Sequence, residues 1–217
     1  MVKHSVETSG RNRQQRSFLT ERRLNRAVIE AMMEDGLAGC TVPAIARRAG
    51  VAVGTIYRRY PDKEALLGTA ILDFVSLGGG EREEEYATLS AKAVDLRDFL
   101  RRVSEMAVKT ARENRTFLLA IRSFAKSATS PAWLAEFKAH RGRGRESIVR
   151  AGMTRFGAQI AGGEQALRFS LAALYGGVEV VWLEPQAGLF SEPPSPDTFI
   201  DAFVEMQTAF LSGGSVD

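Results

Sequence analysis

The chain has 217 residues, of which 45 % are hydrophobic and 25 % charged, with a formal net charge of +3. This composition is typical of a globular protein that can bury a core. No uncharged apolar run reaches the roughly 18 residues of a membrane-spanning helix, and the basic N-terminus lacks the apolar block of a signal peptide, so we expect a cytoplasmic protein.

Residue types that support catalysis or metal binding are few. The single cysteine, Cys40, excludes an intrachain disulfide, and a lone cysteine is more often a small buried apolar residue than a redox switch. His4 and His140 are far apart and do not match the spacing of a metal site. No phosphate-binding loop or nucleophile motif occurs. We therefore expect no catalytic residue, no metal and no cofactor, and a protein that is not an enzyme.

Charge is unevenly distributed along the chain. Residues 1–63 contain 12 Lys and Arg against 6 Asp and Glu, which is a net charge of +6, whereas residues 64–217 contain 17 against 20, a net charge of −3. A basic N-terminal third on a mildly acidic remainder indicates a segment that binds a polyanion, attached to a body with another task.

The first 17 residues are polar without apolar periodicity, so we expect a flexible basic arm. Its arginines are candidates for the DNA minor groove, with a tail of no function as the alternative: Arg11, Arg13 and Arg16. Thr20 is then a predicted N-cap. Apolar residues with helical spacing follow it, and Gly36 and Gly39 are predicted to end this helix: Leu24, Ala27, Val28, Ala31 and Met32.

The stretch TVPAIARRAGVAVGTIYRRYPDKEALL, residues 41–67, predicts two short helices joined by a tight turn. Thr41 is placed to cap the first of them, and Gly50 to close it. The second begins near Val53 and ends at Tyr60, because Pro61 disfavours a helical residue before it. Two such helices, the second short and basic, form a helix-turn-helix that places its second helix in the major groove of DNA.

Side chains of this motif match the chemistry of DNA. Hydroxyl groups and cations can bind phosphates, and an arginine can also read guanine through two hydrogen bonds; the candidates are Thr41, Thr55, Tyr57, Arg58, Arg59 and Lys63. Thr41 could instead be a cap alone. Arg47 and Arg48 could form only a solvated face. Tyr60 fits a core wedge between helices better than a DNA contact.

The remainder of the chain shows only helical periodicity. A fourth helix is predicted from Asp62 to about Phe74, and the glycines and charges of residues 76–85 predict a loop after it. Further helices are predicted over residues 91–112, 114–128, 131–157, 163–184 and 196–212. Residues 184–196 hold four of the seven prolines and are predicted to form a long connection.

The helix-turn-helix stretch resembles the DNA-binding signature of the TetR family of transcriptional regulators. The resemblance covers about residues 22–72 and rests on T-x-x-x-I-A-x-x-A-G-V, then G-T-I-Y, then K-E-x-L-L. It implies an all-α homodimer with an N-terminal three-helix helix-turn-helix domain, residues 18–62, and a larger helical ligand-binding and dimerisation domain, residues 63–217. Carried onto matching positions, the resemblance adds Pro43, Val53 and Gly54 to the DNA contacts. Ala52 departs from it, because a serine often caps the recognition helix there.

The last two predicted helices carry small and apolar residues on broad faces, and two such helices from each subunit would form a four-helix interface. The predicted interface residues are Ala166, Phe169, Ala173, Gly176, Gly177, Val180, Phe199, Phe203, Met206 and Phe210. The alternative is a core within one chain.

Aromatic residues at helical spacing are candidates for a ligand pocket, although such a set is more often core. With possible polar ends added, the candidates are Met106, Phe117, Arg122, Phe124, Trp133, Phe137, His140 and Tyr175, and Trp182 could join them. A pocket of this kind would take a mostly apolar small molecule. The favoured function is a repressor released from a near-palindromic operator by such an effector. The alternative is a DNA-binding regulator, or an activator, whose body responds to a protein partner.

Overall fold

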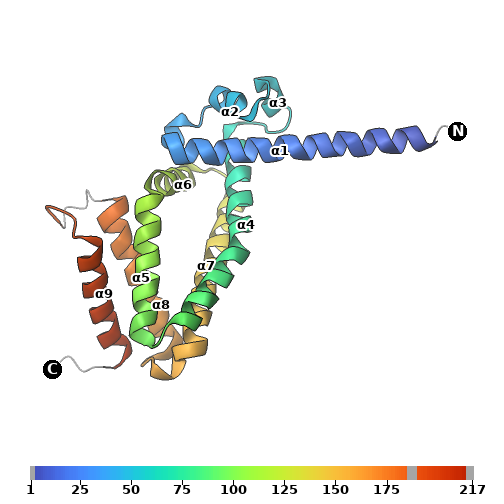
Figure 1. Ribbon diagram of the computed structural model, residues 1–217. Helices are drawn as coiled ribbons and strands as arrows, with labels where there is room; N and C mark the ends of the chain where they lie inside the picture. The colour runs from blue at the N-terminus through green and yellow to red at the C-terminus, as the bar shows by residue number, and fades with distance from the viewer. Residues whose placement is uncertain (1–2, 185–189, 214–217) are drawn as a thin grey trace. The chain divides into compact units, whose positions relative to one another are not determined.

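A computed structural model describes residues 3–184 and 190–213, with side chains from residue 15 onward except at 78–81. Helices alone make up the regular structure of these residues (Figure 1), which confirms the prediction of an all-α protein. The helices are α1 (Lys3–Gly39), α2 (Val42–Ala49), α3 (Val53–Tyr57), α4 (Lys63–Lys92), α5 (Leu96–Glu113), α6 (Arg115–Ser127), α7 (Pro131–Phe156), η1 (Gly157–Gln159), α8 (Gly163–Val178), η2 (Glu179–Leu183) and α9 (Pro196–Leu211).

Contacts divide the chain into two compact units. The first comprises Met1–Ser76 and Leu119–Phe137, and the second comprises Leu77–Leu118 and Lys138–Asp217. This division differs from the predicted boundary after residue 62, because the start of α4 and the segment around the α6–α7 junction pack with the N-terminal helices. Helix α4 contributes to both units.

Helix α1 is longer than the sequence predicts. It begins at Lys3 and runs without interruption to Gly36, where φ is 67° and ψ is −167°. The prediction of an unstructured arm is therefore wrong for residues 3–17, and the predicted cap at Thr20 is wrong as well. Thr20 lies inside the helix, and its hydroxyl donates to the carbonyl oxygen of Arg16 at 2.8 Å. No proline interrupts this segment, and its Arg, Gln and Glu residues are good helix formers.

The core of the first unit forms where α1 meets α2, α3 and the first turns of α4. The apolar positions predicted along α1 are all buried, and Figure 1 shows α2 and α3 lying along this helix. The other buried side chains of this core include Ile45, Ala46, Ala49, Ile56, Leu66, Leu67 and Ile71. These contacts fix the helix-turn-helix on a rigid base.

The loop predicted for residues 76–85 is absent, because α4 continues through this stretch to Lys92. Three successive glycines cost a helix roughly 1 kcal/mol each relative to alanine. The charged residues that follow are good helix formers, and the end of α4 is tied to α7 within the second unit. The hydroxyl of Ser90 donates to the carbonyl oxygen of Ala151 at 2.9 Å, which offsets part of this cost.

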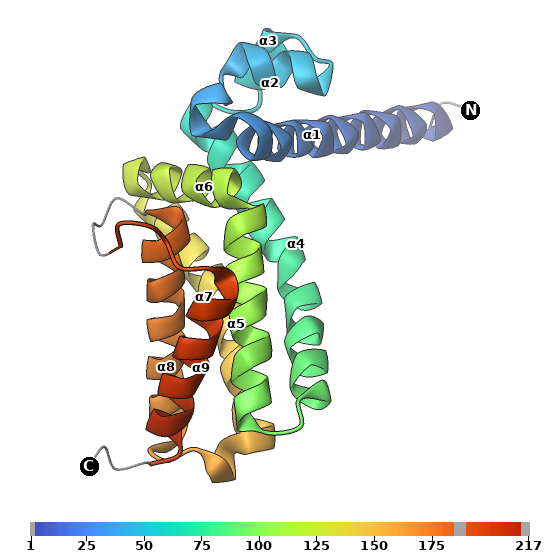
Figure 2. The ribbon, with the colours of Figure 1, turned by 60° about the vertical axis from the view of Figure 1, so that its left-hand side comes forward.

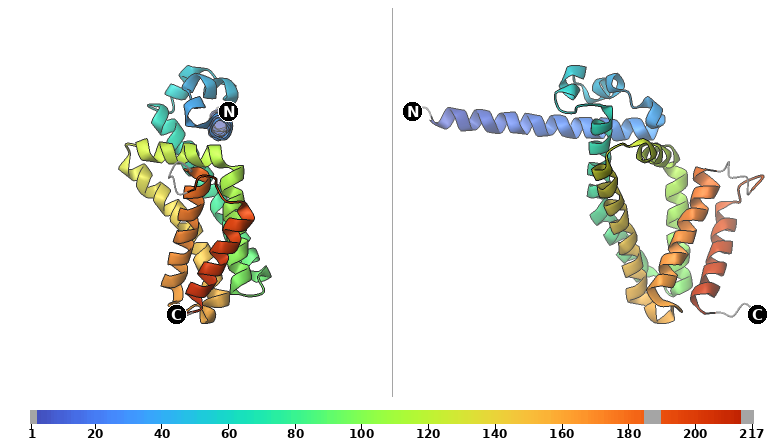
Figure 3. Two further views of the ribbon diagram at one scale, coloured as in Figure 1. Left: turned by 90° about the vertical axis from the view of Figure 1, so that its left-hand side faces the viewer. Right: turned by 180° about the vertical axis from the view of Figure 1, so that it is seen from behind.

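The second unit is built on three helices that lie side by side, α5, α8 and α9 (Figures 2 and 3). Asp95 caps α5 by accepting from the N–H of Asp98 at 2.7 Å, and Ser195 caps α9 by accepting from the N–H of Thr198 at 3.1 Å. Their apolar faces meet that of α7 in one core, whose largest fully buried members are Phe99, Leu100, Ile148, Leu167 and Leu174.

Helix α8 and the π-helical turn η2 together, Gly163–Leu183, are long and apolar enough to cross a membrane by length and composition alone. Its buried residues Leu167, Leu171, Leu174 and Val178 pack in the core of the second unit, as expected for a core helix of a helical bundle. A third of the apolar window is buried in the structure.

Candidate nucleic-acid interface

Helix α2 has the two caps that the sequence predicts. Thr41 adopts an extended backbone, and its hydroxyl oxygen accepts from the N–H of Ala44 at 3.3 Å. Gly50 ends the helix with φ 65° and ψ 40°, a left-handed conformation that side chains disfavour. The N–H of Val51 then donates to the carbonyl oxygen of Ala46 at 3.0 Å. This closed turn sets the direction of the next helix.

Helix α3 is a single short helix of five residues with no side-chain cap. Ala52 has the extended backbone of an N-cap, but it offers no oxygen to the first N–H groups. The alanine at position 52 therefore leaves the N-terminus of α3 without a side-chain cap. Ile56 is the buried residue that holds α3 against the base, while Tyr60, 8 % exposed, packs just beyond its end. Tyr60 is thus the core wedge that the sequence predicts.

The outer face of α3 carries the predicted contact residues. Val53 is 38 % exposed and Tyr57 55 % exposed, and Gly54 and Arg58 are also on the surface. The guanidinium of Arg58 donates to the hydroxyl oxygen of Thr55 at 3.1 Å, one turn apart on the same face. A side-chain hydroxyl thus orients an arginine that presents its remaining donors to solvent.

The flanking residues extend this face. Pro43 and Arg47 of α2 are exposed, Arg59 is half-buried, and Lys63 at the start of α4 is exposed. Asp62 caps α4 by accepting from the N–H of Ala65 at 2.7 Å, as the sequence predicts. The surface around α3 therefore offers hydroxyl groups, an aromatic ring and cations together.

Arg48 is engaged within the first unit. Its guanidinium donates to Glu34 at 2.8 Å and to Asp35 at 3.4 Å, so it links α2 to the end of α1. The Glu34 hydrogen bond is the main cause of a pKa of Arg48 above its usual range. This arginine belongs to the packing of the motif, whereas its neighbour Arg47 is on the solvated face.

Cys40 is fully buried, and its thiol donates to the carbonyl oxygen of Gly36 at 3.4 Å. Burial raises the pKa of the thiol, and the nearby Lys63 opposes this only in part. A buried, protonated thiol is a poor nucleophile and a slow redox centre. The structure favours the apolar role predicted from the sequence.

The predicted arm residues are helical. Arg16 is exposed on α1, and the side chains of Arg11 and Arg13 lie outside the described part of the structure. The minor-groove role of these three arginines was predicted for an unstructured arm. Residues 3–17 are part of helix α1, so the structure removes the basis of that prediction.

Three of the aromatic residues predicted for a pocket pack together within the first unit. Trp133 meets Phe124 edge to face with ring centroids 5.0 Å apart, and it stacks on Phe137 at 4.9 Å. All three are buried, and the indole N–H of Trp133 donates to the carbonyl oxygen of Gly68. These rings pack against each other and against α4, so they form a core.

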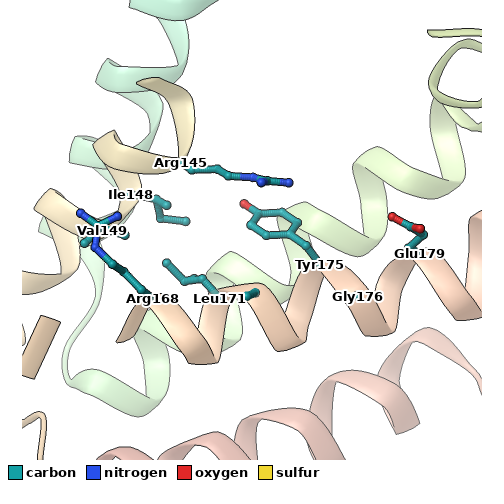
Figure 4. A pocket seen from close by; sticks show the side chains of 9 residues that line it. Arg145, Ile148, Val149, Arg168, Leu171, Tyr175, Gly176 and Glu179 are labelled. Atoms are coloured by element: carbon teal, nitrogen blue, oxygen red, sulfur yellow. The ribbon is translucent and has the colours of Figure 1, made fainter. Parts of the chain in front are cut away.

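The other pocket candidates are dispersed. Phe117 is buried, Met106, Arg122, His140 and Tyr175 are half-buried, and His140 contacts Arg143 one turn along α7. Trp182 packs edge to face on Phe199 at 4.9 Å. Of the predicted set only Tyr175 lines a cavity of about 400 Å³ between α7 and α8 (Figure 4).

Sequence reasoning missed most residues of this cavity. Arg145, Ile148 and Val149 face it from α7, and Arg168, Leu171 and Tyr175 face it from α8. The signal was the spacing 145, 148, 149 in one helix and 168, 171, 175 in the other, which places each set on one helix face. The pairing of the two helices is the information that the sequence lacks.

Most of the predicted dimer residues form a surface across α8 and α9. Phe169 is 64 % exposed, Met206 56 % and Phe210 46 %, and the rings of Phe169 and Phe210 lie 5.8 Å apart. Gly176 is exposed too, and half-buried residues complete the set: Ala166, Ala173, Gly177, Val180 and Phe199. Phe203, 6 % exposed, packs instead in the core of its own unit and stacks on Phe199.

The described side chains were also compared with the ligand sets that hold metal ions in proteins. Within residues 3–184 and 190–213, no group of three or more His, Cys, Asp or Glu side chains is placed to hold a metal ion.

Comparison with known proteins finds a family model that matches the helix-turn-helix and its flanking helices. Residues 26–70 match the family model described as "Bacterial regulatory proteins, tetR family". An uncharacterised HTH-type transcriptional regulator, Mb2274c, of Mycobacterium bovis is 35 % identical over 82 residues, which are 35 % of this chain and 43 % of that protein. The chain therefore matches less than half the length of this curated relative.

Solved structures share the fold over nearly the whole chain. A putative TetR-family transcriptional regulator from Mesorhizobium loti superposes with a TM-score of 0.64 at 21 % identity, covering 89 % of this chain and 97 % of its own. FadR from Bacillus subtilis, a transcriptional regulator solved in complex with stearoyl-CoA, gives a TM-score of 0.59 at 14 % identity, covering 87 % and 98 %. Residues 26–70 thus match the TetR family model, and the solved structures show the same fold over most of the chain.

Proposed function

We propose that the protein is a dimeric, cytoplasmic transcriptional regulator that represses by binding a near-palindromic operator and is released by a small-molecule effector. The observation that carries the proposal is the outer face of α3, where Tyr57 and Arg58 project to solvent and Ile56 holds the helix to the core. Such a helix fits the major groove, which is about 12 Å wide.

Different side chains have different tasks in this proposal. Arg58, oriented by Thr55, reads a guanine, and Val53 contacts a thymine methyl group. The remaining polar contacts go to phosphates and fix the position of the head on the duplex: Thr41, Gly54, Tyr57, Arg59 and Lys63. Pro43 has no N–H to donate, so it makes only van der Waals contact with the DNA. The hydroxyl of Thr41 accepts from Ala44 and keeps its own hydrogen for a phosphate oxygen.

Dimerisation and release complete the mechanism. The exposed apolar surface of α8 and α9, which includes Phe169, Met206 and Phe210, pairs two copies. Two heads then read half-sites separated by an integral number of helical turns. The effector acts by binding the DNA-free conformation more tightly, and it shifts the balance only by that difference in affinity. A bound acyl-CoA in the similar FadR structure supports a small-molecule effector.

Selection of bound duplexes from random DNA, at a fixed salt concentration, tests the proposal. Enrichment of a near-palindrome is the expected result. Binding of any duplex alike would contradict it. An operator that is bound but never released by small molecules would favour the alternative, a regulator that responds to a protein partner.

Arg58→Ala then tests the reading of the operator. The variant is expected to lose about tenfold or more in affinity and to accept other bases at one position of each half-site, because a bidentate arginine contact discriminates by roughly 1–3 kcal/mol. Arg112→Ala, which removes an exposed arginine from α5, is the matched control for net charge. Equal affinity and equal base preference in the two variants would exclude this role for Arg58.

A further inference from the structure

The cavity between α7 and α8 has an apolar wall and a polar rim. Ile148 and Val149 from α7 and Leu171 from α8 form the wall and are almost completely buried. With a volume of about 400 Å³, the cavity lies at the lower end of the range for ligand sites, roughly 300–1,000 Å³. It lies wholly within the second unit. A small molecule with a hydrocarbon part fits this lining.

The two arginines at the cavity differ in their partners. Arg168 is matched twice, with Glu146 at 2.6 Å and Glu164 at 2.7 Å. Arg145 is exposed, and its guanidinium lies 5.6 Å from the centre of the Tyr175 ring. Among the side chains that the structure describes, no carboxylate lies within ion-pair distance of Arg145. One cation at this cavity is therefore neutralised by the protein, and the other is available to a ligand.

Tyr175 places a hydroxyl beside this available cation. Figure 4 shows Arg145 reaching over the hydroxyl end of the Tyr175 ring from the opposite helix. Burial and the neighbouring Tyr86, which hydrogen-bonds Tyr175, raise the pKa of Tyr175, so its hydroxyl stays protonated. A ligand carboxylate would take over the hydrogen bond that the hydroxyl now makes with Tyr86. A guanidinium and a phenol that converge in this way are suited to the two oxygens of a carboxylate.

Glu179 also lines the cavity. It lies one helical turn beyond Tyr175 and gives the cavity an acidic end (Figure 4). An anionic group is favoured at Arg145. We propose that this cavity binds a monocarboxylate with an aliphatic tail, the carboxylate on Arg145 and Tyr175 and the tail against Ile148, Val149 and Leu171. That this ligand is the effector rests on the proposed function; the binding site itself does not.

Calorimetric titration of the full-length protein with decanoate, 1-decanol and decylamine tests the proposal. Decanoate is expected to bind at least tenfold more tightly than the other two, because only the carboxylate makes charge-assisted hydrogen bonds. Arg145→Gln is expected to weaken decanoate binding about tenfold or more and Tyr175→Phe several-fold, with little change for 1-decanol. Arg145→Lys keeps the charge and retains part of the affinity.

Arg141→Gln is the matched control, since it removes an exposed arginine one turn earlier on α7 that does not line the cavity. No decanoate binding, equal binding of decanoate and 1-decanol, or equal losses in Arg145→Gln and Arg141→Gln would each overturn the site. Operator binding is measured on the same preparation. If the protein binds its operator but not decanoate, the proposed function stands and the proposed ligand site is wrong. If it binds decanoate but no DNA, the ligand site stands and the proposed function is wrong.

Discussion

The indole N–H of Trp133 donates to the backbone carbonyl oxygen of Gly68 at 2.9 Å, and the ring occupies the space that a side chain at position 68 would need. A Cβ atom at Gly68 would come within 2.9 Å of the indole nitrogen and 3.0 Å of its neighbouring ring carbon. Glu64, one turn earlier on α4, accepts from the N–H of Thr129 at 2.7 Å. These contacts tie the start of α4 to α7 within the first unit.

Gly68→Ala is therefore expected to destabilise the protein. The clash with a ring held by Phe124 and Phe137 costs roughly 1–3 kcal/mol, which exceeds the gain of about 1 kcal/mol that alanine brings to a helix. Urea unfolding followed by circular dichroism measures the difference. Gly142→Ala is the matched control, because a Cβ there meets no atom within 4 Å and should stabilise α7. Equal effects of the two substitutions would show that Trp133 yields to the new methyl group.

Ala52→Ser is expected to strengthen the start of α3. Position 52 already has the backbone of an N-cap, with φ −73° and ψ 147°, but no cap oxygen. A serine there should add about 0.5–1 kcal/mol to stability and raise operator affinity, since the outer face of α3 is better ordered. Urea unfolding and fluorescence anisotropy with the selected operator measure the two effects. Ala52→Val, which has no hydroxyl, is the control and should bring neither gain.

The Cys40 thiol predicts a loss of stability at alkaline pH. Its folded pKa is raised above the unfolded value of about 8.5. A raised pKa means that the folded state binds this proton more tightly. The contribution is thus complete below pH 8.5 and is lost as pH rises through the folded pKa. Between pH 7.5 and 9.5, the free energy of unfolding should fall more in the wild type than in Cys40→Ala, which lacks the thiol. Parallel curves would contradict the argument.

The α8–α9 surface predicts which substitutions give monomers. Phe169→Glu and Met206→Glu place charges on the most exposed apolar positions of the surface, and light scattering should show the mass of one chain. Val94→Glu, at an apolar position 80 % exposed outside this surface, should leave the dimer intact. Gly177 is less suitable, because a side chain there would meet Phe199 at 3.1 Å and disturb folding. Dimers that persist in both variants would move the interface elsewhere.

Local chemistry made much of the first unit predictable. Thr41, Gly50 and Asp62 begin or end helices through interactions with residues three or four positions away, and such signals are legible in the sequence. Local signals also misled. The glycines of residues 76–85 predicted a loop, yet α4 continues because contacts such as that between Ser90 and Ala151 connect residues far apart in the chain.

The cavity illustrates what a single sequence lacks. Trp133 and Tyr175 looked alike as pocket candidates, but the ring of Trp133 is buried against Gly68 and that of Tyr175 faces Arg145. Whether such a ring lies in a core or lines a cavity depends on which helices pack together. Helix pairing involves residues far apart in the chain, so one sequence does not reveal it. The exposure of the residues proposed to contact DNA was easier to predict, because α3 takes its orientation from Ile56 and the turn at Gly50, both within the motif itself.

The two carboxylates on Arg48 have a consequence for how binding responds to ionic strength. Each cation that neutralises a phosphate releases condensed counterions and adds about 0.9 to the slope of log affinity against log salt. Arg48 is already neutralised by Glu34 and Asp35, so it releases none. With Arg59 and Lys63 as the proposed cations on phosphates, each head contributes a slope of roughly 1.8. Because Glu34 and Asp35 neutralise Arg48, the affinity of the helix-turn-helix for DNA should depend less on salt concentration than the number of its arginines implies. Shape complementarity and hydrogen bonds should contribute correspondingly more.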